Sequence, residues 1–240
     1  MKVGIAQLKS FPGDIELNLE NHLRFINEQF ARNSDLLLFP ELSITGYEPK
    51  LAESLAFEIN DKRLMKLGAA SREKNMTIGI GLPLRQKEGI TISILLFYPN
   101  GERKVYSKRY LHPDEEHYFI AVKDDSLPII PEFPISVGIC YEIFIDEHIE
   151  AANQNEMIYM ASVAKFGHNI NKALKRLKDV SFKFGSTVLM SNAVGEADGL
   201  QCAGQSTAWQ KGKVIFQMPR NKEGIIIFDT ETGIVTNRIL

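Results

Sequence analysis

Residues 35–41 read Asp-Leu-Leu-Leu-Phe-Pro-Glu, a short apolar run without the alternation of a half-exposed strand. Such a run is typical of a parallel strand that is buried on both of its faces. Residues 134–140, Pro-Ile-Ser-Val-Gly-Ile-Cys, have the same character, and each run ends in a reactive side chain, Glu41 or Cys140. Because parallel strands need long crossover connections, usually helices, these runs predict an α/β fold.

The chain around these runs follows one plan twice, β-α-β-α-β and then a hairpin. The first half is predicted to contain strands 2–8, 35–40, 76–81, 90–98 and 102–107, with helices 15–33 and 59–74 capped by Asp14 and Asn60. The second half is predicted to contain strands 134–140, 156–161, 187–192, 205–210, 213–217 and 224–229, with helices 146–154 and 170–184. This plan predicts a four-layer α-β-β-α sandwich of two mixed sheets in a single domain over residues 1–240. One continuous doubly wound sheet is the alternative.

The composition narrows the function classes. Lys and Arg number 28 against 30 Asp and Glu, and the formal net charge of −2 offers no electrostatic footprint for nucleic acid or an anionic membrane. Two cysteines are too few for a disulfide scaffold or a four-cysteine zinc site. No apolar stretch is long enough to cross a membrane and no leader segment is visible, so we expect a cytoplasmic protein.

Three polar side chains stand out by their position. Glu41 and Cys140 directly follow buried strands, and ligands of parallel α/β sheets bind beyond the carboxyl ends of strands. Lys108 follows the hairpin strand 102–107. Each also has an ordinary structural interpretation, as a loop charge, a small buried thiol or a surface lysine. A helix soon after Cys140 is expected to lower the pKa of its thiol through the N-terminal amides.

The surroundings of these three residues match the motifs of one family. Residues 39–47, Phe-Pro-Glu-Leu-Ser-Ile-Thr-Gly-Tyr, are similar to the first signature of the nitrilase superfamily, the carbon–nitrogen hydrolases. Residues 106–112, Tyr-Ser-Lys-Arg-Tyr-Leu-His, resemble the second motif. Residues 138–142, Gly-Ile-Cys-Tyr-Glu, resemble the third, and the motifs occur in the family's order. The resemblance covers essentially the whole chain.

The resemblance implies a catalytic triad and a reaction. Cys140 is the implied nucleophile and Glu41 the general base, while Lys108 and the backbone amide of Tyr141 are the implied oxyanion site. The implied enzyme is a thiol amidohydrolase. It would cleave the C–N bond of a small non-peptide amide through a cysteine thioester and release ammonia or an amine. No cofactor and no metal ion are expected.

Further site residues follow from the same resemblance. A second glutamate, which would hold the lysine, is expected at Glu115, four residues before an aromatic side chain, with Glu116 as the alternative. Tyr47 of the first motif is expected in the substrate pocket. Ser162 and Lys165 are expected there too, because they belong to the loop that lines the pocket in the family.

The chain departs from the family pattern after its cysteine. The family often continues Cys-Tyr-Asp-x-Arg, whereas residues 140–144 read Cys-Tyr-Glu-Ile-Phe, so the arginine that could bind a substrate carboxylate is missing. Lys165 is a candidate for an anionic substrate group, and a surface lysine is the alternative. His112, His117 and His168 lack the i, i+4 spacing of a helical metal site.

Other functions stay open. A nitrilase would use the same triad on a nitrile carbon, and a non-catalytic binding or scaffold protein would keep the fold alone. A thiol-redox protein would need Cys202 as the resolving cysteine for Cys140. A glutaminase subunit would deliver ammonia to a separate synthetase, since this chain has no Gly-x-x-x-x-Gly-Lys-Ser/Thr loop. The resemblance also implies a homo-oligomer, a dimer or larger, with the helix after Cys140 and residues 230–240 as candidate contacts.

Overall fold

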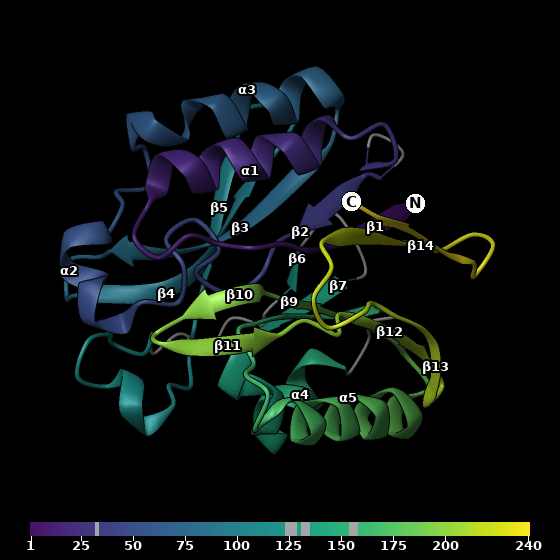
Figure 1. Cartoon of the computed structure of the whole chain (residues 1–240). Helices are drawn as coiled ribbons and strands as arrows, with labels where there is room; N and C mark the ends of the chain where they lie inside the picture. The colour runs from purple at the N-terminus through teal and green to yellow at the C-terminus, as the bar shows by residue number, and fades with distance from the viewer. Residues whose placement is uncertain (32–33, 123–128, 131–134, 154–157) are drawn as a thin grey trace.

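The structure, a computed structural model, describes residues 1–31, 34–122, 129–130, 135–153 and 158–240. Its elements form four layers, helix, sheet, sheet and helix, with the two large sheets packed face to face (Figure 1). This arrangement confirms the predicted α-β-β-α sandwich of two mixed sheets. The alternative of one continuous sheet is wrong, because the strands divide into separate hydrogen-bonded sheets.

The first sheet joins the N-terminal half of the chain to its C-terminal strands. Its strands are, in spatial order, β15 (Val235–Ile239), β14 (Gly224–Asp229), β1 (Lys2–Gln7), β2 (Leu36–Leu38), β3 (Thr77–Arg85), β4 (Ile90–Phe97) and β5 (Arg103–Ser107). Strands β1, β2 and β3 are parallel to one another, and the remaining pairs are antiparallel. Helices α1 (Ile15–Asn27) and α3 (Met65–Lys74) cover the outer face of this sheet (Figure 1).

The second sheet contains most of the C-terminal half. Its strands are, in spatial order, β13 (Lys213–Gln217), β12 (Thr207–Gln210), β9 (Thr187–Asn192), β8 (Ile158–Val163), β7 (Ile135–Ile139) and β6 (Ile129–Ile130). Strands β7, β8 and β9 are parallel. Helices α4 (Asp146–Ala152) and α5 (Ile170–Phe184) cover its outer face (Figure 1). A separate hairpin consists of β10 (Val194–Ala197) and β11 (Leu200–Ala203).

Short helical turns lie in the connections between these elements. They are the helix α2 (Ala52–Leu55) and the 3-10 turns η2 (Pro49–Leu51), η3 (Lys62–Leu64), η4 (Pro113–Glu115) and η5 (Cys140–Phe144). Both η4 and η5 follow strands and contain residues that the sequence singles out.

The two faces of β2 explain the unalternating apolar run in the sequence. Leu36 and Leu38 belong to the cluster between the sheets, together with Val137 and Met160 of the second sheet. Leu37 points the other way and packs in the cluster beneath α1 and α3. Both faces are buried, so every residue of the strand must be apolar.

Several predicted boundaries change in the structure. The side chain of Asp14 accepts a hydrogen bond from the amide of Leu17 and caps α1 as predicted, but the helix ends at Asn27 because Glu28 adopts an extended backbone. The predicted helix 59–74 begins as η3, which is capped by Asp61 rather than Asn60. Residues 134 and 156, at the start of predicted strands, lie outside the described residues.

The last predicted strand does not join the second sheet. Residues 224–229 form β14, which pairs antiparallel with β1 and places Ile226 opposite Ile5. The sequence pattern also does not predict β10, β11 or β15. The two ends of the chain therefore lie side by side in the first sheet (Figure 1).

Candidate active site

Glu41 lies in a turn that leaves β2 and folds back onto β3. The amide of Ile44 donates to the carbonyl oxygen of Gly81 at 3.1 Å. A Cβ atom on Gly81 would lie 2.3 Å from the carbonyl oxygen of Pro40, so the turn can approach the strand this closely only at a glycine. The packed turn leaves no part of the Glu41 side chain exposed.

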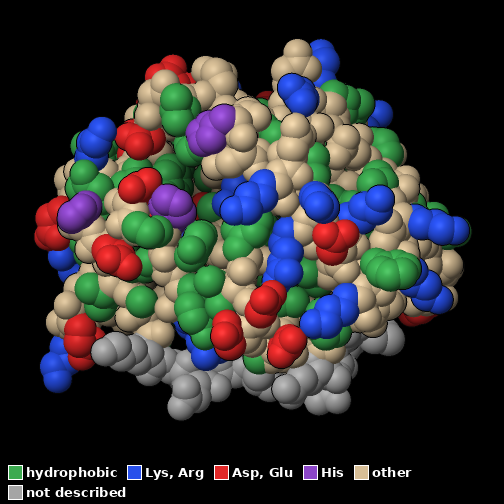
Figure 2. Space-filling view, turned by 90° about the horizontal axis from the view of Figure 1, so that it is seen from below, with side chains coloured by type: hydrophobic (Ala, Val, Ile, Leu, Met, Phe, Trp, Pro, Cys, Tyr) green, Lys and Arg blue, Asp and Glu red, His purple; other side chains and the backbone are tan. Residues whose placement is uncertain are grey.

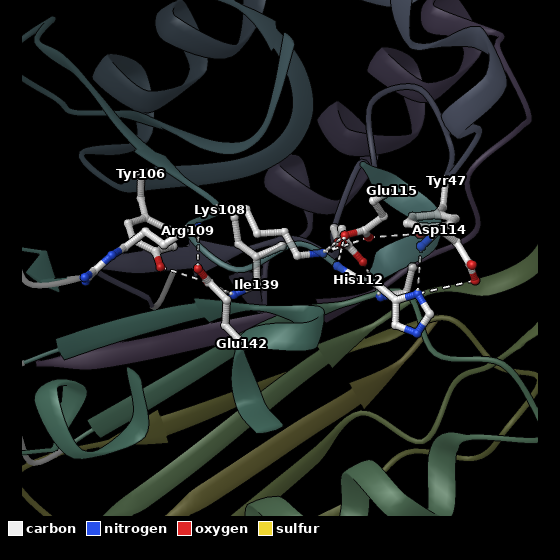
Figure 3. A network of polar contacts seen from close by, with 11 residues as sticks. Tyr47, Tyr106, Lys108, Arg109, His112, Asp114, Glu115, Ile139 and Glu142 are labelled. Atoms are coloured by element: carbon white, nitrogen blue, oxygen red, sulfur yellow. Dashed lines mark hydrogen bonds and ion pairs between the residues drawn. The ribbon is translucent and has the colours of Figure 1, made fainter. Parts of the chain in front are cut away.

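Lys108 emerges from the same end of the first sheet. Its backbone amide donates to the carbonyl oxygen of Ile92 at 2.8 Å, which continues the pairing of β5 with β4. Its Nζ atom donates to Oε1 of Glu41 at 2.8 Å and to the two oxygens of Glu115 at 2.8 and 2.9 Å (Figure 3). The fully buried ammonium therefore lies between two buried carboxylates.

Glu115 is the glutamate that holds this lysine. It ends η4, where its Oε2 atom accepts a hydrogen bond from the amide of His112 at 2.8 Å. The hydroxyl of Tyr47 donates to its Oε1 atom at 2.9 Å (Figure 3). Glu116 is exposed. Of the two candidates, the structure thus brings Glu115 to Lys108.

Cys140 occupies a sharp turn between β7 and η5. Its φ of +48° lies in the left-handed region, a strained conformation for a residue other than glycine. Glu142 bridges this turn, since its carboxylate accepts hydrogen bonds from the amides of Ile139 and Arg109, both at 2.7 Å. The hydroxyl of Tyr106 donates to it at 2.8 Å (Figure 3). Glu142 therefore joins the cysteine turn of the second sheet to the end of β5 in the first.

Two further hydrogen bonds connect the sheets at this point. The amide of Ala164 donates to Oε2 of Glu41 at 3.2 Å. The hydroxyl of Ser162 donates to the carbonyl oxygen of Phe39 at 2.9 Å. Ser162 is fully buried in this contact and is not among the residues that line the cavity, although the sequence places it in the substrate pocket.

Burial controls the protonation of the reactive groups. It raises the pKa of Glu41, and the nearby charge of Lys108 opposes that shift. Burial would lower the pKa of Lys108, but the negative charges around it, first that of Glu41, raise the pKa above its usual value and keep the ammonium charged.

The thiol of Cys140 is shifted in the direction opposite to the prediction. Burial, followed by the charge of Glu41, raises the pKa of Cys140 to about 11, although Lys165 and Lys108 act to lower it. The predicted lowering by helix amides is wrong, because only the short 3-10 turn η5 begins at the cysteine and desolvation outweighs it. The resting thiol is therefore protonated at neutral pH and needs a base.

A cavity of about 470 Å³ opens above these residues. Its lining includes Cys140, Glu115, Tyr47, Tyr141 and Lys165, all named by the sequence. Glu41 and Lys108 lie beneath the lining without exposed side-chain surface. Figure 2 shows the hollow on this face, with histidine side chains at its rim. His112, His117 and His168 are among the residues that line the cavity.

Sequence reasoning missed the supporting residues. Glu142 lies within the third motif, and that position was the available signal for its role. Tyr106 begins the second motif, which likewise was the available signal, whereas the backbone amide of Ala164 carries none in the sequence. Within the described ranges, no group of three or more His, Cys, Asp or Glu side chains could hold a metal ion. No helix in the described part of the chain is long and apolar enough to span a membrane.

Known proteins resemble this chain along nearly its whole length. The carbon–nitrogen hydrolase family model matches residues 2–236. A glutamine-dependent NAD(+) synthetase of Thermotoga maritima is 27% identical over 96% of this chain, but the chain spans only 42% of that relative. A probable nitrilase of Schizosaccharomyces pombe is 26% identical over 96% of this chain and 89% of its own length.

Solved structures share the fold. A mutant of the amidase from Nesterenkonia sp. AN1, in complex with butyramide, superposes with a TM-score of 0.85 at 21% identity, covering 97% of this chain and 92% of the amidase. The family match along the chain confirms the resemblance to the nitrilase superfamily that the three motifs indicate. The chain belongs to the carbon–nitrogen hydrolase family.

Proposed function

We propose that this protein is a thiol amidohydrolase that cleaves a small non-peptide amide. The observation that carries the proposal is the position of one buried ammonium. Lys108 is hydrogen-bonded to Glu41, directly beneath the cavity that Cys140 lines. A nucleophile, a base and a fixed positive charge are the groups that acyl transfer from an amide requires.

The first half of the reaction forms a thioester. Glu41 takes the proton of the Cys140 thiol while the sulfur attacks the amide carbon. The pKa of Glu41 is raised by burial, which makes this carboxylate a better proton acceptor for a thiol of high pKa. The oxyanion that develops is stabilised by the ammonium of Lys108 and by the backbone amide of Tyr141. The C–N bond then breaks, and Glu41 returns its proton to the leaving nitrogen.

The second half releases the acid. Glu41 activates a water molecule, which adds to the thioester carbon, and the resulting tetrahedral species expels the Cys140 sulfur. Glu115 keeps Lys108 in place through its two contacts and does not itself exchange protons. The Tyr47 hydroxyl orients Glu115 from the side of the cavity.

The nitrile reaction remains the alternative within the same site. Relatives of this chain include a probable nitrilase and an arylacetonitrilase, at 26% and 25% identity. An amide loses its nitrogen when the thioester forms, after Glu41 has protonated that nitrogen. A nitrile keeps its nitrogen when the sulfur adds to its carbon, and the product of that addition is a thioimidate. Parallel assays of a nitrile and the corresponding amide would separate the two reactions.

Hydrolysis of the glutamine amide is a second candidate. Two glutamine-dependent NAD(+) synthetases, from Thermotoga maritima and Aquifex aeolicus, match 96% and 97% of this chain. Such a function would deliver the ammonia to a synthetase that consumes it. Ammonia release from glutamine, measured beside release from unsubstituted aliphatic amides, decides whether glutamine is the preferred substrate.

The decisive experiment uses the two cysteines as a matched pair. Cys140→Ala should abolish ammonia release from every amide in a panel of C2–C6 aliphatic amides. Cys202→Ala should retain it, since burial raises the pKa of Cys202 to about 12 and leaves that thiol unreactive. Amide turnover by Cys140→Ala would overturn the proposal. A Cys140–Cys202 disulfide found by mass spectrometry after mild peroxide would instead favour the thiol-redox function.

We further propose a cytoplasmic enzyme whose residues 1–240 act as one catalytic unit and assemble into a homo-oligomer. Exposed apolar side chains lie on the segments expected to form contacts or beside them, including Ile234 and Ile239 near β15 and Phe182 on α5. Light scattering coupled to size-exclusion chromatography would give the mass of the assembly. A monomer at micromolar concentration would contradict this part of the proposal.

A further inference from the structure

Among the described residues, the charges around the cavity leave the ammonium of Lys165 without a counter-ion. Lys50 is paired with Asp198 and Glu115 with Lys108, and the His112 ring contacts Asp114. Lys165 also lines the cavity, yet it forms no ion pair with any residue that the structure describes. It is only 6% exposed, and the part of it that is exposed faces the cavity. An enclosed ammonium of this kind is costly unless an anion accompanies it.

Lys165 is held rigidly at this position. Its amide donates to Oδ1 of Asn192 at 2.7 Å. Its carbonyl oxygen accepts hydrogen bonds from the Ala203 amide at 2.7 Å and from Nδ2 of Asn192 at 3.3 Å. Its Nζ atom lies 5.2 Å from the centre of the Phe144 ring. The hydrogen bonds fix the backbone of Lys165, and the Phe144 ring lies beside its ammonium, so part of the cost of ordering the residue is met before an anion binds.

The ammonium is also close enough to the reaction centre to influence it. The positive charge of Lys165 acts to lower the pKa of both Cys140 and Glu41. A substrate that places its amide carbon at Cys140 can therefore reach Lys165 with only a short chain. The cavity of about 470 Å³ has room for such a molecule.

From this juxtaposition we propose that Lys165 binds the carboxylate of the substrate, which is then a short amide that carries a carboxylate group. The inference rests on the proposed amidohydrolase function. In this proposal, the ammonium of Lys165, just after β8, takes the place of the arginine that this chain lacks after Cys140. The carboxylate belongs either to the acyl part, as in a dicarboxylic acid monoamide, or to the leaving amine, as in an N-acyl amino acid.

Substrate pairs that differ in charge test the proposal. Succinamate and butyramide report on a carboxylate in the acyl part, and N-acetylglycine and N-ethylacetamide report on one in the leaving amine. The wild type should prefer the charged member of one pair in kcat/KM, and that pair identifies where the carboxylate lies. Lys165→Met should reduce this preference at least tenfold, mainly through KM, and Lys165→Arg should restore part of it.

Lys172→Met is the matched control. The Lys172 Nζ atom also lies near the Phe144 ring, at 4.9 Å, but its side chain is exposed and outside the cavity. This variant should keep the substrate preference of the wild type. An equal loss on charged and neutral amides in Lys165→Met would overturn the inference and assign Lys165 to the charge environment of Cys140.

A binding measurement separates this inference from the proposed function. Succinate should raise the Tm of the wild type and of Cys140→Ala, and it should not raise that of Lys165→Met. If no amide is hydrolysed but this Tm difference is found, the proposed function fails and the anion site stands. If amides are hydrolysed without preference for a carboxylate and succinate has no effect, the anion site fails and the function stands.

Discussion

Replacing Glu41 by glutamine removes the proposed base while keeping the shape of the side chain. The magnitude follows from the state of the thiol. With the pKa of Cys140 raised to about 11, about one thiol in a thousand is ionised at pH 8. Turnover that depended on this fraction alone would be slower by the same factor. We therefore expect Glu41→Gln to lower kcat by roughly 100- to 10,000-fold, the range of general base catalysis.

The same variant should respond differently to a thiol reagent. The charge of Glu41 is the second cause of the raised pKa of Cys140, after burial. Without that charge, the inflection in the pH dependence of iodoacetamide alkylation should move to lower pH. Alkylation needs no protonation of a leaving nitrogen, so it reports on the thiol alone. Ammonia release from the best amide and the alkylation profile are measured on the same preparation.

The surface variant Glu53→Gln serves as the control, because Glu53 is exposed and pairs with Arg85. It should match the wild type in both assays. The reasoning is refuted if Glu41→Gln keeps its turnover within about threefold of the wild type, below the general base range. It is also refuted if the alkylation inflection of Glu41→Gln moves to higher pH.

Other residues give shorter tests. Glu115→Gln should lower the free energy of unfolding in urea by about 3 kcal/mol and reduce kcat, since it breaks a buried ion pair, whereas the exposed Glu116→Gln should do neither. Burial raises the pKa of Glu142 to about 7 from 4.5, so its contribution to stability is full below pH 4.5 and is lost as the pH rises through 7. Between these two pH values, the free energy of unfolding of the wild type should thus fall by about 3 kcal/mol relative to that of Glu142→Gln. A difference between the two proteins that stays constant with pH would contradict the argument. Gly81→Ala should lower both Tm and kcat because its Cβ atom would displace the turn at Pro40, and unchanged kinetics would show that the turn can adjust.

The layers of the fold were predictable because they depend on local patterns. Residues 170–184 form α5 with the predicted bounds, since a stripe that includes Ala173 and Leu177 is buried and Gly185 ends the helix in a left-handed conformation. Residues 187–192 form β9 in the same way, from a continuous apolar run. In both cases the burial that decides the structure is visible within a few residues of sequence.

Long-range pairing was not predictable from such patterns. Residues 224–229 have the pattern of a strand, but nothing in them specifies that β14 pairs with β1 at the other end of the chain. The edge strand β15 has a mostly exposed pattern, so its formation depends on the neighbouring β14. These features arise from contacts between residues that are distant in sequence.

The candidate site was predictable in the identity of its polar side chains and not in their environment. Glu41, Lys108 and Cys140 could be named from motifs, and the structure places them at one end of the sandwich. The raised pKa of Cys140 depends on its burial and on the charge of Glu41, which no motif records. The bridging contacts of Glu142 likewise depend on two strands of different sheets.

The proposed reactive groups are divided between the sheets, with Glu41 and Lys108 from the first and Cys140 from the second. A chain in which only one sheet has formed therefore cannot carry out the proposed hydrolysis. An unfolded cysteine with a pKa of about 8.5 would be about one quarter ionised at pH 8, far more than the buried one. In a Cys202→Ala background, the rate at which alkylation of Cys140 is lost during refolding would thus give the rate at which the two sheets pack together. Assembly of the sandwich and the onset of hydrolysis would be the same kinetic event.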